Sequence, residues 1–327
     1  MSSSHSPPSP RAVHHGDGNY LDQIRLDIAR SHINLDRHVS AKRSVRKSRI
    51  GNVLRLLVGG AMIRLGLREP LVMSGLSRRW FDDFTTYWYD ILGGRPIPTV
   101  ADFNALLYEY RRRQQHVDEL SWGDAAQHVA NWQAPDAIYL TFHGTRRLAL
   151  QPIVGLRLWR LVPRGARVLE YGCSLAPYYY CYRHYFSHLG CSFVLADIPN
   201  FPFHYAKHLY RHDAEVEFAT IGPDQFREPL ADPECVARFD VIIVTTVFEH
   251  LDDPPFVARY LLDRLNPNGL LVFDYIKSEG HGLDHPNALR TRQAALSTIL
   301  GETEVVHGNV DDLEESIGFC IARKVDG

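Results

Sequence analysis

The chain has 327 residues, of which 45% are hydrophobic and 23% are charged, the usual balance for a soluble globular protein. A formal net charge of -2 excludes a protein that binds nucleic acid through its overall charge, although a local basic patch stays open. The five cysteines include no CxxC pair, which argues against a disulfide framework or a zinc site and predicts a cytoplasmic protein. No stretch reaches the roughly 18 apolar residues that a membrane-spanning helix needs.

Helical patterns fill the first part of the chain. Residues 1–18 begin with a run rich in Ser and Pro and predict a disordered tail. Residues 19–138 predict a helical region that covers the substrate side or binds a surface. Within that region, helical patterns run over residues 20–38, 50–67, 100–120 and 122–132.

One segment of this helical region is strongly basic. Residues 37–79 hold eleven Lys and Arg residues and a single acid, Glu69. With apolar residues between the charges, the segment suits peripheral contact with an anionic membrane surface or with an acidic substrate. A helix packed on the rest of the protein, with a solvated basic face, explains the same pattern. Nucleic acid is the least favoured partner, since no recognised DNA- or RNA-binding module accompanies the charge.

Short apolar runs alternate with helical stretches after Val162. Five of these runs predict strands that are buried on both faces: 167–170, 192–195, 216–219, 240–244 and 270–273. Strands alternating with helices indicate βαβ units, and hence an α/β fold with a doubly wound, mostly parallel sheet over residues 139–327. Two further strands are expected at 304–306 and 317–322.

A loop of small residues follows the first predicted strand. The strand ends in Glu170, and Gly172, Ser174 and Ala176 keep the following turn lean. In an open parallel sheet, ligands bind beyond the carboxyl ends of the strands, where the winding direction switches. The second strand ends in Asp197, whose carboxylate is suited to accept hydrogen bonds from ribose hydroxyls.

These segments resemble the class I S-adenosylmethionine-dependent methyltransferases, a family with a Rossmann-like fold. The family's loop, an acid followed by Gly-x-Gly-x-Gly, matches residues 170–176, with Ser and Ala in place of the second and third glycines. The family's second-strand acid matches Asp197. Residues 239–251, FDVIIVTTVFEHL, and 264–273, RLNPNGLLVF, are similar to its fourth strand and to the turn before its fifth. The four motifs occur in the family's order.

The resemblance implies S-adenosyl-L-methionine as the cofactor. It assigns cofactor binding to residues at or after the ends of the first four strands: Glu170, Gly172, Ser174, Ala176, Asp197, Ile221, Asp224, Thr245 and Thr246. It also implies methyl transfer to a small-molecule or glycan acceptor, with oxygen as the favoured atom. Two alternatives stay open, a membrane-surface enzyme with a lipid-linked acceptor and a catalytically inactive cofactor-binding scaffold, which the missing glycines motivate. The oligomeric state does not follow from the motifs.

Three histidines are candidates for the base that removes the acceptor's proton. An imidazole suits this task because its ordinary pKa, about 6.5, lies near working pH. His281 and His285 follow the fifth strand, where family members build substrate sites, and His250 follows the fourth. A divalent metal bound by Glu249 and these histidines is a weaker alternative, because Thr246 stands where metal-binding members have an acid. We therefore expect no metal.

Overall fold

The computed structural model describes residues 76–94, 96–114, 120–148, 157–230, 238–277 and 283–325. The predicted helices at 20–38 and 50–67, the tail at 1–18 and residues 37–75 of the basic segment lie outside these ranges. Among the helices of the described ranges, none is both long enough and apolar enough to cross a membrane.

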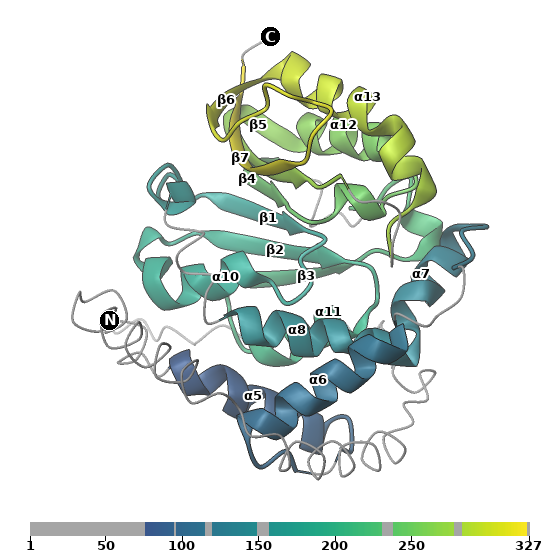
Figure 1. Ribbon diagram of the computed structural model, residues 1–327. Helices are drawn as coiled ribbons and strands as arrows, with labels where there is room; N and C mark the ends of the chain where they lie inside the picture. The colour runs from purple at the N-terminus through teal and green to yellow at the C-terminus, as the bar shows by residue number, and fades with distance from the viewer. Residues whose placement is uncertain are drawn as a thin grey trace, which may run out of the picture.

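A sheet of seven strands forms the centre of the described structure, in the order β3-β2-β1-β4-β5-β7-β6 (Figure 1). All neighbouring strands are parallel except β7, which runs antiparallel to β5 and β6. The strands are β1 Arg167–Tyr171, β2 Ser192–Asp197, β3 Val216–Thr220, β4 Phe239–Val244, β5 Leu265–Tyr275, β6 Thr303–His307 and β7 Ile317–Lys324. The predicted α/β fold with a mostly parallel sheet is confirmed, and the two final strands lie where the sequence places them.

Helices cover both faces of this sheet. The described ranges include the α-helices α5 Leu76–Asp90, α6 Val100–Gln114, α7 Ala125–Gln133, α8 Tyr139–Leu148, α10 Pro177–Cys181, α11 Phe201–Tyr210, α12 Pro254–Arg264 and α13 Pro286–Glu302. Val168 and Val241 join the apolar cluster that contains residues of α5, α6, α8, α10 and α11. Leu169 and Ile242, one position along their strands, join the cluster that contains α12 and α13. Successive side chains of a strand point to opposite faces, so continuous apolar runs supply both clusters.

The strand order creates the place where a ligand is expected. From β1 the chain winds through β2 to β3 at one edge, and it then crosses to β4 on the other side of β1. The winding direction therefore switches between β1 and β4, and their carboxyl ends border a crevice. The loop after β1 and the loop after β4 both begin at this crevice.

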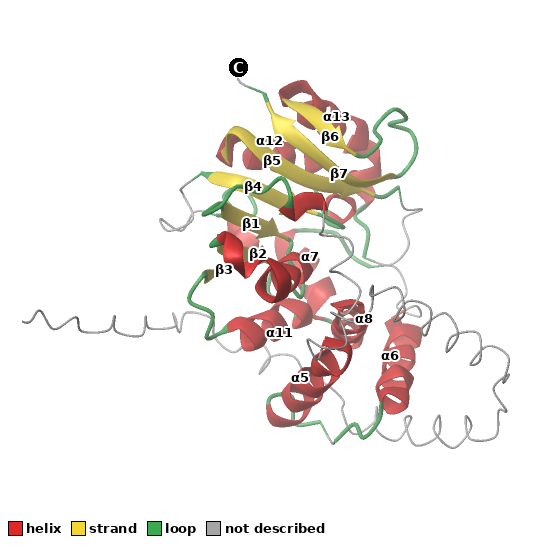
Figure 2. Ribbon diagram, turned by 90° about the vertical axis from the view of Figure 1, so that its left-hand side faces the viewer, coloured by secondary structure: helices red, strands yellow, loops and turns green. Residues whose placement is uncertain are grey.

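The N-terminal helices share the core of the sheet. The predicted helix at 100–120 is α6 and that at 122–132 is α7, whereas α5 has no counterpart among the predicted helices. Phe84 of α5 is fully buried, and its ring lies 4.6 Å from that of Phe142 in α8 and 5.6 Å from that of Tyr205 in α11. Figure 2 shows α5, α6, α8 and α11 gathered on one side of the strands. The predicted boundary at residue 138 falls between the 3₁₀-helix Pro135–Ile138 and α8, and helices on both sides of it pack in the same apolar cluster.

Replacing Phe84 with Ala should lower the free energy of unfolding by about 3–5 kcal/mol, because a fully buried ring is lost and a cavity remains. Tyr89 on the same helix is 55% exposed, and Tyr89→Ala is the matched control, with an expected change within about 0.5 kcal/mol. Denaturant unfolding measures both variants. If Phe84→Ala loses as little stability as Tyr89→Ala, α5 is not packed in the core.

Candidate active site

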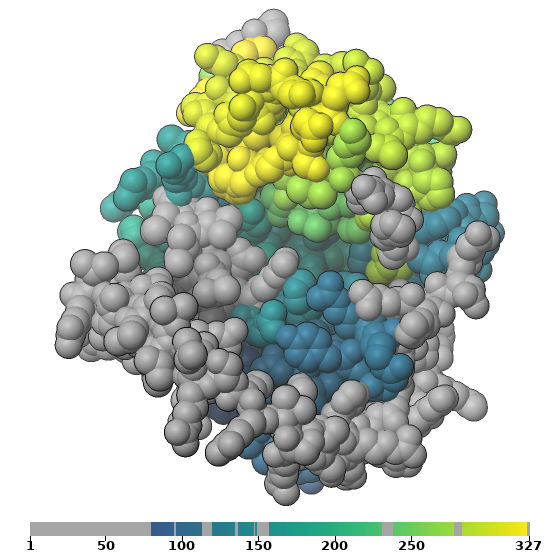
Figure 3. Space-filling model, in the orientation of Figure 1, coloured from purple at the N-terminus to yellow at the C-terminus, as the bar shows by residue number. Residues whose placement is uncertain are grey.

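A cavity of about 480 Å³ opens at the carboxyl ends of β1, β2 and β4. The loop after β1 contributes Gly172–Leu175, Asp197 ends β2, and residues 245–247 follow β4. His128 and Trp132 of α7 add a wall from the N-terminal part of the chain. In the space-filling view, the blue N-terminal helices and the yellow C-terminal strands lie on either side of the teal and green middle of the chain (Figure 3). The volume lies within the range of small-molecule sites, about 300–1,000 Å³.

The loop after β1 has the backbone conformation of a glycine-rich loop, although only Gly172 of the three expected glycines is present. Gly172 has φ +64°, and a Cβ there would lie 2.4 Å from Cγ2 of Val247. Ser174 and Ala176, which replace the family's other two glycines, have φ of 53° and 51°, in the left-handed region that glycine favours. The substitutions therefore leave the loop conformation in place, at a backbone strain of about 1 kcal/mol each.

Replacing Gly172 with Ala should destabilise the fold by about 1–3 kcal/mol, because the new methyl group overlaps Val247 in a well-packed wall of the cavity. Gly165 also has a positive φ, but a Cβ there meets no atom within 4 Å. Gly165→Ala is therefore the control for backbone strain alone. Thermal unfolding of the two variants separates the contact from the strain, and an equal effect would contradict the close approach to Val247.

Glu170 is a buried residue that anchors the loop after β1 through hydrogen bonds. Its side chain is buried, and its two carboxylate oxygens accept hydrogen bonds from the backbone N–H groups of Tyr178 (3.2 Å) and Tyr179 (3.0 Å). Burial raises the pKa of Glu170 to about 8, against the lowering effect of these two hydrogen bonds. The carboxyl group thereby ties the end of β1 to the first turn of α10 and also borders the cavity.

Asp197 connects the same loop to β2. Its Oδ2 accepts a hydrogen bond from the Ser174 N–H at 2.7 Å, and its Oδ1 accepts one from Asn200 Nδ2 at 3.0 Å. Burial raises its pKa to about 7, opposed by these bonds. Since a carboxylate offers about four lone-pair sites, this cavity-lining group retains acceptor capacity for ligand hydroxyls.

The remaining predicted cofactor residues divide into two groups. Ile221, Thr245 and Thr246 line the cavity, whereas Ala176 is buried away from its wall and Asp224 is exposed outside it. Thr246 has φ 55°, which is strained for a β-branched residue, and its N–H donates to Oδ1 of Asp274 at 2.6 Å. Asp274, on β5, was not a predicted site residue, and burial raises its pKa to about 6. Such strain is characteristic of functional sites.

His250 lies in the cavity wall with one ring nitrogen engaged. Its Nδ1 is 3.0 Å from Asp284 Oδ1 and 3.1 Å from the carbonyl oxygen of Leu283. Both partners are acceptors, which assigns the proton to Nδ1 and leaves Nε2 with its lone pair. Burial alone lowers the pKa of His250, but the hydrogen bond with Asp284 and the charges of Glu249 and Asp284 outweigh it and raise the pKa.

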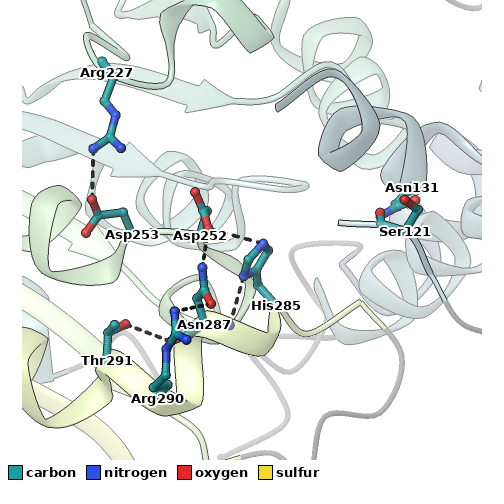
Figure 4. Close-up of polar contacts among 9 residues, drawn as sticks. All are labelled: Ser121, Asn131, Arg227, Asp252, Asp253, His285, Asn287, Arg290 and Thr291. Atoms are coloured by element: carbon teal, nitrogen blue, oxygen red, sulfur yellow. Dashed lines mark hydrogen bonds and ion pairs between the residues drawn. The ribbon is translucent and has the colours of Figure 1, made fainter. Parts of the chain in front are cut away.

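His285 has a different environment. Its Nδ1 accepts a hydrogen bond from the N–H of Asn287 at 3.1 Å and so caps α13, while its Nε2 lies 3.5 Å from Asp252 Oδ1 (Figure 4). The side chain is buried and is not among the residues that line the cavity. Burial lowers its pKa, against the charge of Asp252. His281 lies outside the described residues.

The cavity wall also contains residues that the motifs did not predict. His128 and Trp132 lie four positions apart on α7, and Arg227, after β3, pairs with Asp253 at 2.9 Å (Figure 4). The i, i+4 spacing within the predicted helix at 122–132 was a signal that these two rings share a face. Within the described part of the chain, no group of three or more His, Cys, Asp and Glu residues is arranged to hold a metal ion.

Residues 142–299 match a family model described as a methyltransferase domain. No curated protein matches the sequence. Among solved structures, the fold is similar to the N-methyltransferase NodS from Bradyrhizobium japonicum WM9, at 17% identity and a TM-score of 0.39 over 54% of this chain and 96% of that one. It is also similar to the [4+2]-cyclase SpnF, at 17% identity and a TM-score of 0.41 over 55% of this chain and 81% of that one. A methyltransferase from Pyrococcus furiosus is similar at 16% identity and a TM-score of 0.36, over 54% of this chain and 83% of that one.

The structural likenesses describe the fold alone, and the family match identifies the domain. The match spans β1 to β5 and so includes the glycine-type loop, Asp197 and the segment that carries His250. Residues 142–299 are thus a methyltransferase domain, which resembles the class I S-adenosylmethionine-dependent methyltransferases in its Rossmann-like fold.

Proposed function

We propose that the protein transfers the methyl group of S-adenosylmethionine to a hydroxyl oxygen of a small-molecule or glycan acceptor. One observation carries the proposal: His250, with its tautomer fixed by Asp284, borders the same cavity as Gly172 and Asp197. A base held in this way beside a cofactor site fits an acceptor that loses a proton during the reaction.

The residues around the cavity suit S-adenosylmethionine in charge and in hydrogen-bonding capacity. Five carboxyl groups border it, from Glu170, Asp197, Asp252, Asp253 and Asp274, against a single guanidinium group. With a pKa of about 8, Glu170 is mostly uncharged at neutral pH, but the other carboxyl groups still outnumber the guanidinium group and complement a sulfonium cation. Asp197 also has lone pairs left for ribose hydroxyls. When bound, the cofactor supplies an electrophilic methyl group on positively charged sulfur.

The chain's own contribution is positioning and removal of a proton. Thr245 and Thr246 follow the end of β4, a few positions before His250, and border the same cavity. We place the acceptor hydroxyl beside these two residues. The proton of the acceptor hydroxyl would pass to Nε2 of His250 as its oxygen takes the methyl group, whose bond to sulfur would break and leave its electron pair on a neutral thioether. Asp284 then faces the imidazolium that results and stabilises its charge. Positioning of this kind is worth roughly 7–11 kcal/mol of the barrier.

The pH dependence tests the His250–Asp284 pair. His250 works when unprotonated, so the rate rises with pH until the ring has lost its proton, at a pKa that the pair holds above the ordinary value of 6.5. In Asp284→Asn the raising influence is gone, so the acidic limb of the pH–rate profile should move to lower pH while the maximal rate falls. Asp224→Asn, an exposed acid outside the cavity, is the control and should keep the wild-type profile. An unmoved limb in Asp284→Asn contradicts the pairing.

The methylated atom is tested directly by transfer of label from methyl-labelled S-adenosylmethionine into a cell extract and a panel of hydroxyl compounds. We expect a labelled methyl ether that withstands alkali and that appears in proportion to enzyme. Label on nitrogen, or label confined to the lipid fraction, contradicts the proposal, and the second result supports the lipid-linked acceptor. A folded protein that binds cofactor but transfers no label is the inactive scaffold. The left-handed φ of Ser174 and Ala176 weakens that alternative, since the loop keeps its glycine conformation.

The proposal includes a cytoplasmic setting. The four cysteines in the described ranges, Cys173, Cys181, Cys191 and Cys320, are free and buried, which suits a reducing compartment. Fractionation of cells that produce the full chain, followed by sedimentation with anionic liposomes, tests this setting and the proposed peripheral contact of residues 37–79 together.

A further inference from the structure

Helix α7 is held rigidly beside the cavity. Asp124 caps its start by accepting the N–H of Gln127 at 2.8 Å, and Asn131 donates from Nδ2 to the carbonyl oxygen of Ser121, also at 2.8 Å (Figure 4). At its other end, Gln133 donates from Nε2 to the carbonyl oxygen of Pro199, in the loop after β2. These bonds fix which face of the short helix meets the cavity.

Two cavity-lining side chains of this helix each carry a polar atom that lacks a hydrogen-bond partner in the described structure. Nδ1 of His128 and Nε1 of Trp132 are both buried, and among the residues that the structure describes neither has a hydrogen-bond partner. The His128 side chain is only 7% exposed, and both residues border the cavity. A buried polar atom left unsatisfied costs about 1–3 kcal/mol, so a ligand that bonded either atom would recover that free energy on binding.

The chemistry of the two atoms restricts that ligand. An indole N–H is only a donor, so the group facing Trp132 is an acceptor such as oxygen. Burial lowers the pKa of His128 to about 4, aided by the nearby charges of His285 and His250, so the ring is neutral at working pH. A neutral imidazole has one donor and one acceptor nitrogen, which suits a hydroxyl group.

The rest of the wall excludes an anion and favours a ring. Even with Glu170 protonated, four carboxyl groups and one guanidinium group border the cavity, so a carboxylate or phosphate ligand meets net repulsion. Apolar side chains complete the wall near α7, including Leu140, Phe226 and Phe256. The ring of Phe226 lies 5.4 Å from that of His128, and that of Trp132 lies edge-on, 4.9 Å from that of His250.

We propose that α7 is the acceptor-recognition element, with Trp132 Nε1–H and His128 Nδ1 binding oxygen atoms of a neutral, ring-containing alcohol or phenol beside His250. This inference rests on the proposed function and adds to it the substrate class and two positioning residues. Because Trp132 touches the ring of the base, an acceptor held by α7 presents its hydroxyl to that base.

The indole signals of the full-length protein in ¹H–¹⁵N spectra test the inference. The sequence has five Trp residues, and Trp132→Phe identifies the signal of Trp132. The control is Trp122, which contacts the rings of His128 and His285 but does not line the cavity, and its signal is identified with Trp122→Phe. The probes are resorcinol, a neutral ring with two hydroxyls, and 3-hydroxybenzoate, its anionic counterpart, each added to protein saturated with S-adenosylhomocysteine.

We expect resorcinol to move the Trp132 signal further than the Trp122 signal, and 3-hydroxybenzoate to bind at least about tenfold more weakly. His128→Phe should weaken resorcinol binding by about fivefold, whereas His128→Asn, which keeps a polar atom near the place of Nδ1, should restore most of it. S-adenosylhomocysteine affinity should be unchanged in both variants.

Three results overturn the inference. If S-adenosylhomocysteine binds but resorcinol leaves the Trp132 signal in place, α7 does not recognise this class and the proposed function stands. If the cofactor product alone produces the whole shift, α7 holds the cofactor instead of the acceptor. If S-adenosylhomocysteine itself does not bind to folded protein, the proposed function fails and the inference fails with it.

Discussion

His250→Ala is expected to lower kcat by about 10²–10⁴-fold, the usual contribution of a positioned general base. The affinity for S-adenosylhomocysteine should stay within about twofold, because a base acts on the chemical step and not on cofactor binding. The reason lies in the geometry: Nδ1 is engaged by Asp284 and Leu283, the ring borders the cavity, and Nε2 is left to take the proton. Single-turnover rates with labelled cofactor, and calorimetry for affinity, measure the two quantities separately.

His285→Ala is the matched control for this experiment. His285 caps α13 through its bond with the Asn287 N–H, so its loss should cost about 0.5–2 kcal/mol of stability and leave kcat nearly unchanged. His281→Ala completes the set, since the sequence named all three histidines as candidates. If His250→Ala keeps the wild-type rate while His281→Ala or His285→Ala loses it, the base is one of the residues after β5 and the role given to His250 is wrong.

Asp197→Ala should weaken cofactor binding by about 1.5–3 kcal/mol, tenfold or more in Kd, because a charge-assisted acceptor for the ribose hydroxyls is lost. The structure adds a second reason. Asp197 also accepts the Ser174 N–H at 2.7 Å and so holds the loop against the cavity, which places the expected loss at the upper end of this range. Calorimetry with S-adenosylhomocysteine measures the change.

Two variants make the Asp197 result specific. Asp197→Asn keeps one oxygen acceptor without the charge and should lose less affinity than Asp197→Ala. Asp224→Ala removes an exposed acid that the sequence also assigned to the cofactor but that lies outside the cavity, and its Kd should stay within about twofold of the wild type. Equal affinity in Asp197→Ala and wild type removes Asp197 from the cofactor site.

The sheet was predictable because its strands are apolar on both faces. Continuous apolar runs such as Val241–Val244 are typical of strands in the middle of a parallel sheet that is covered on both faces. The five predicted runs coincide with β1 to β5. Helix α5 was missed although Phe84 and Tyr87 face the core. Its buried aromatic residues Trp80, Phe84 and Trp88 recur at helical spacing, so the sequence held a signal for this helix that was overlooked. Its packing against α8 and α11 adds stability that no local pattern contains.

The conformation of the loop after β1 and the roles of the histidines depend on contacts between residues that are distant in sequence. In the sequence, Ser174 and Ala176 stand where the family has glycine, which suggests a different loop. Both residues nevertheless have a left-handed backbone, and the hydrogen bond from the Ser174 N–H to Asp197 helps to hold it. From their positions after a strand, the sequence favoured His281 or His285 as the base, with His250 next. What separates them is a contact between His250 and Asp284, distant in sequence, and the capping bond of His285. Unpartnered atoms such as Trp132 Nε1 emerge only once every neighbour is placed.

Calorimetric titration of the full-length protein with S-adenosylmethionine, and in parallel with NAD, tests whether this cavity binds the methyl donor. The account predicts one molecule of S-adenosylmethionine bound per chain, release of bound cofactor by S-adenosylhomocysteine, and no heat with NAD, since a lining rich in carboxyl groups repels a pyrophosphate. Folded protein that binds NAD, or that binds neither compound, would contradict the assignment of this cavity to S-adenosylmethionine-dependent methyl transfer.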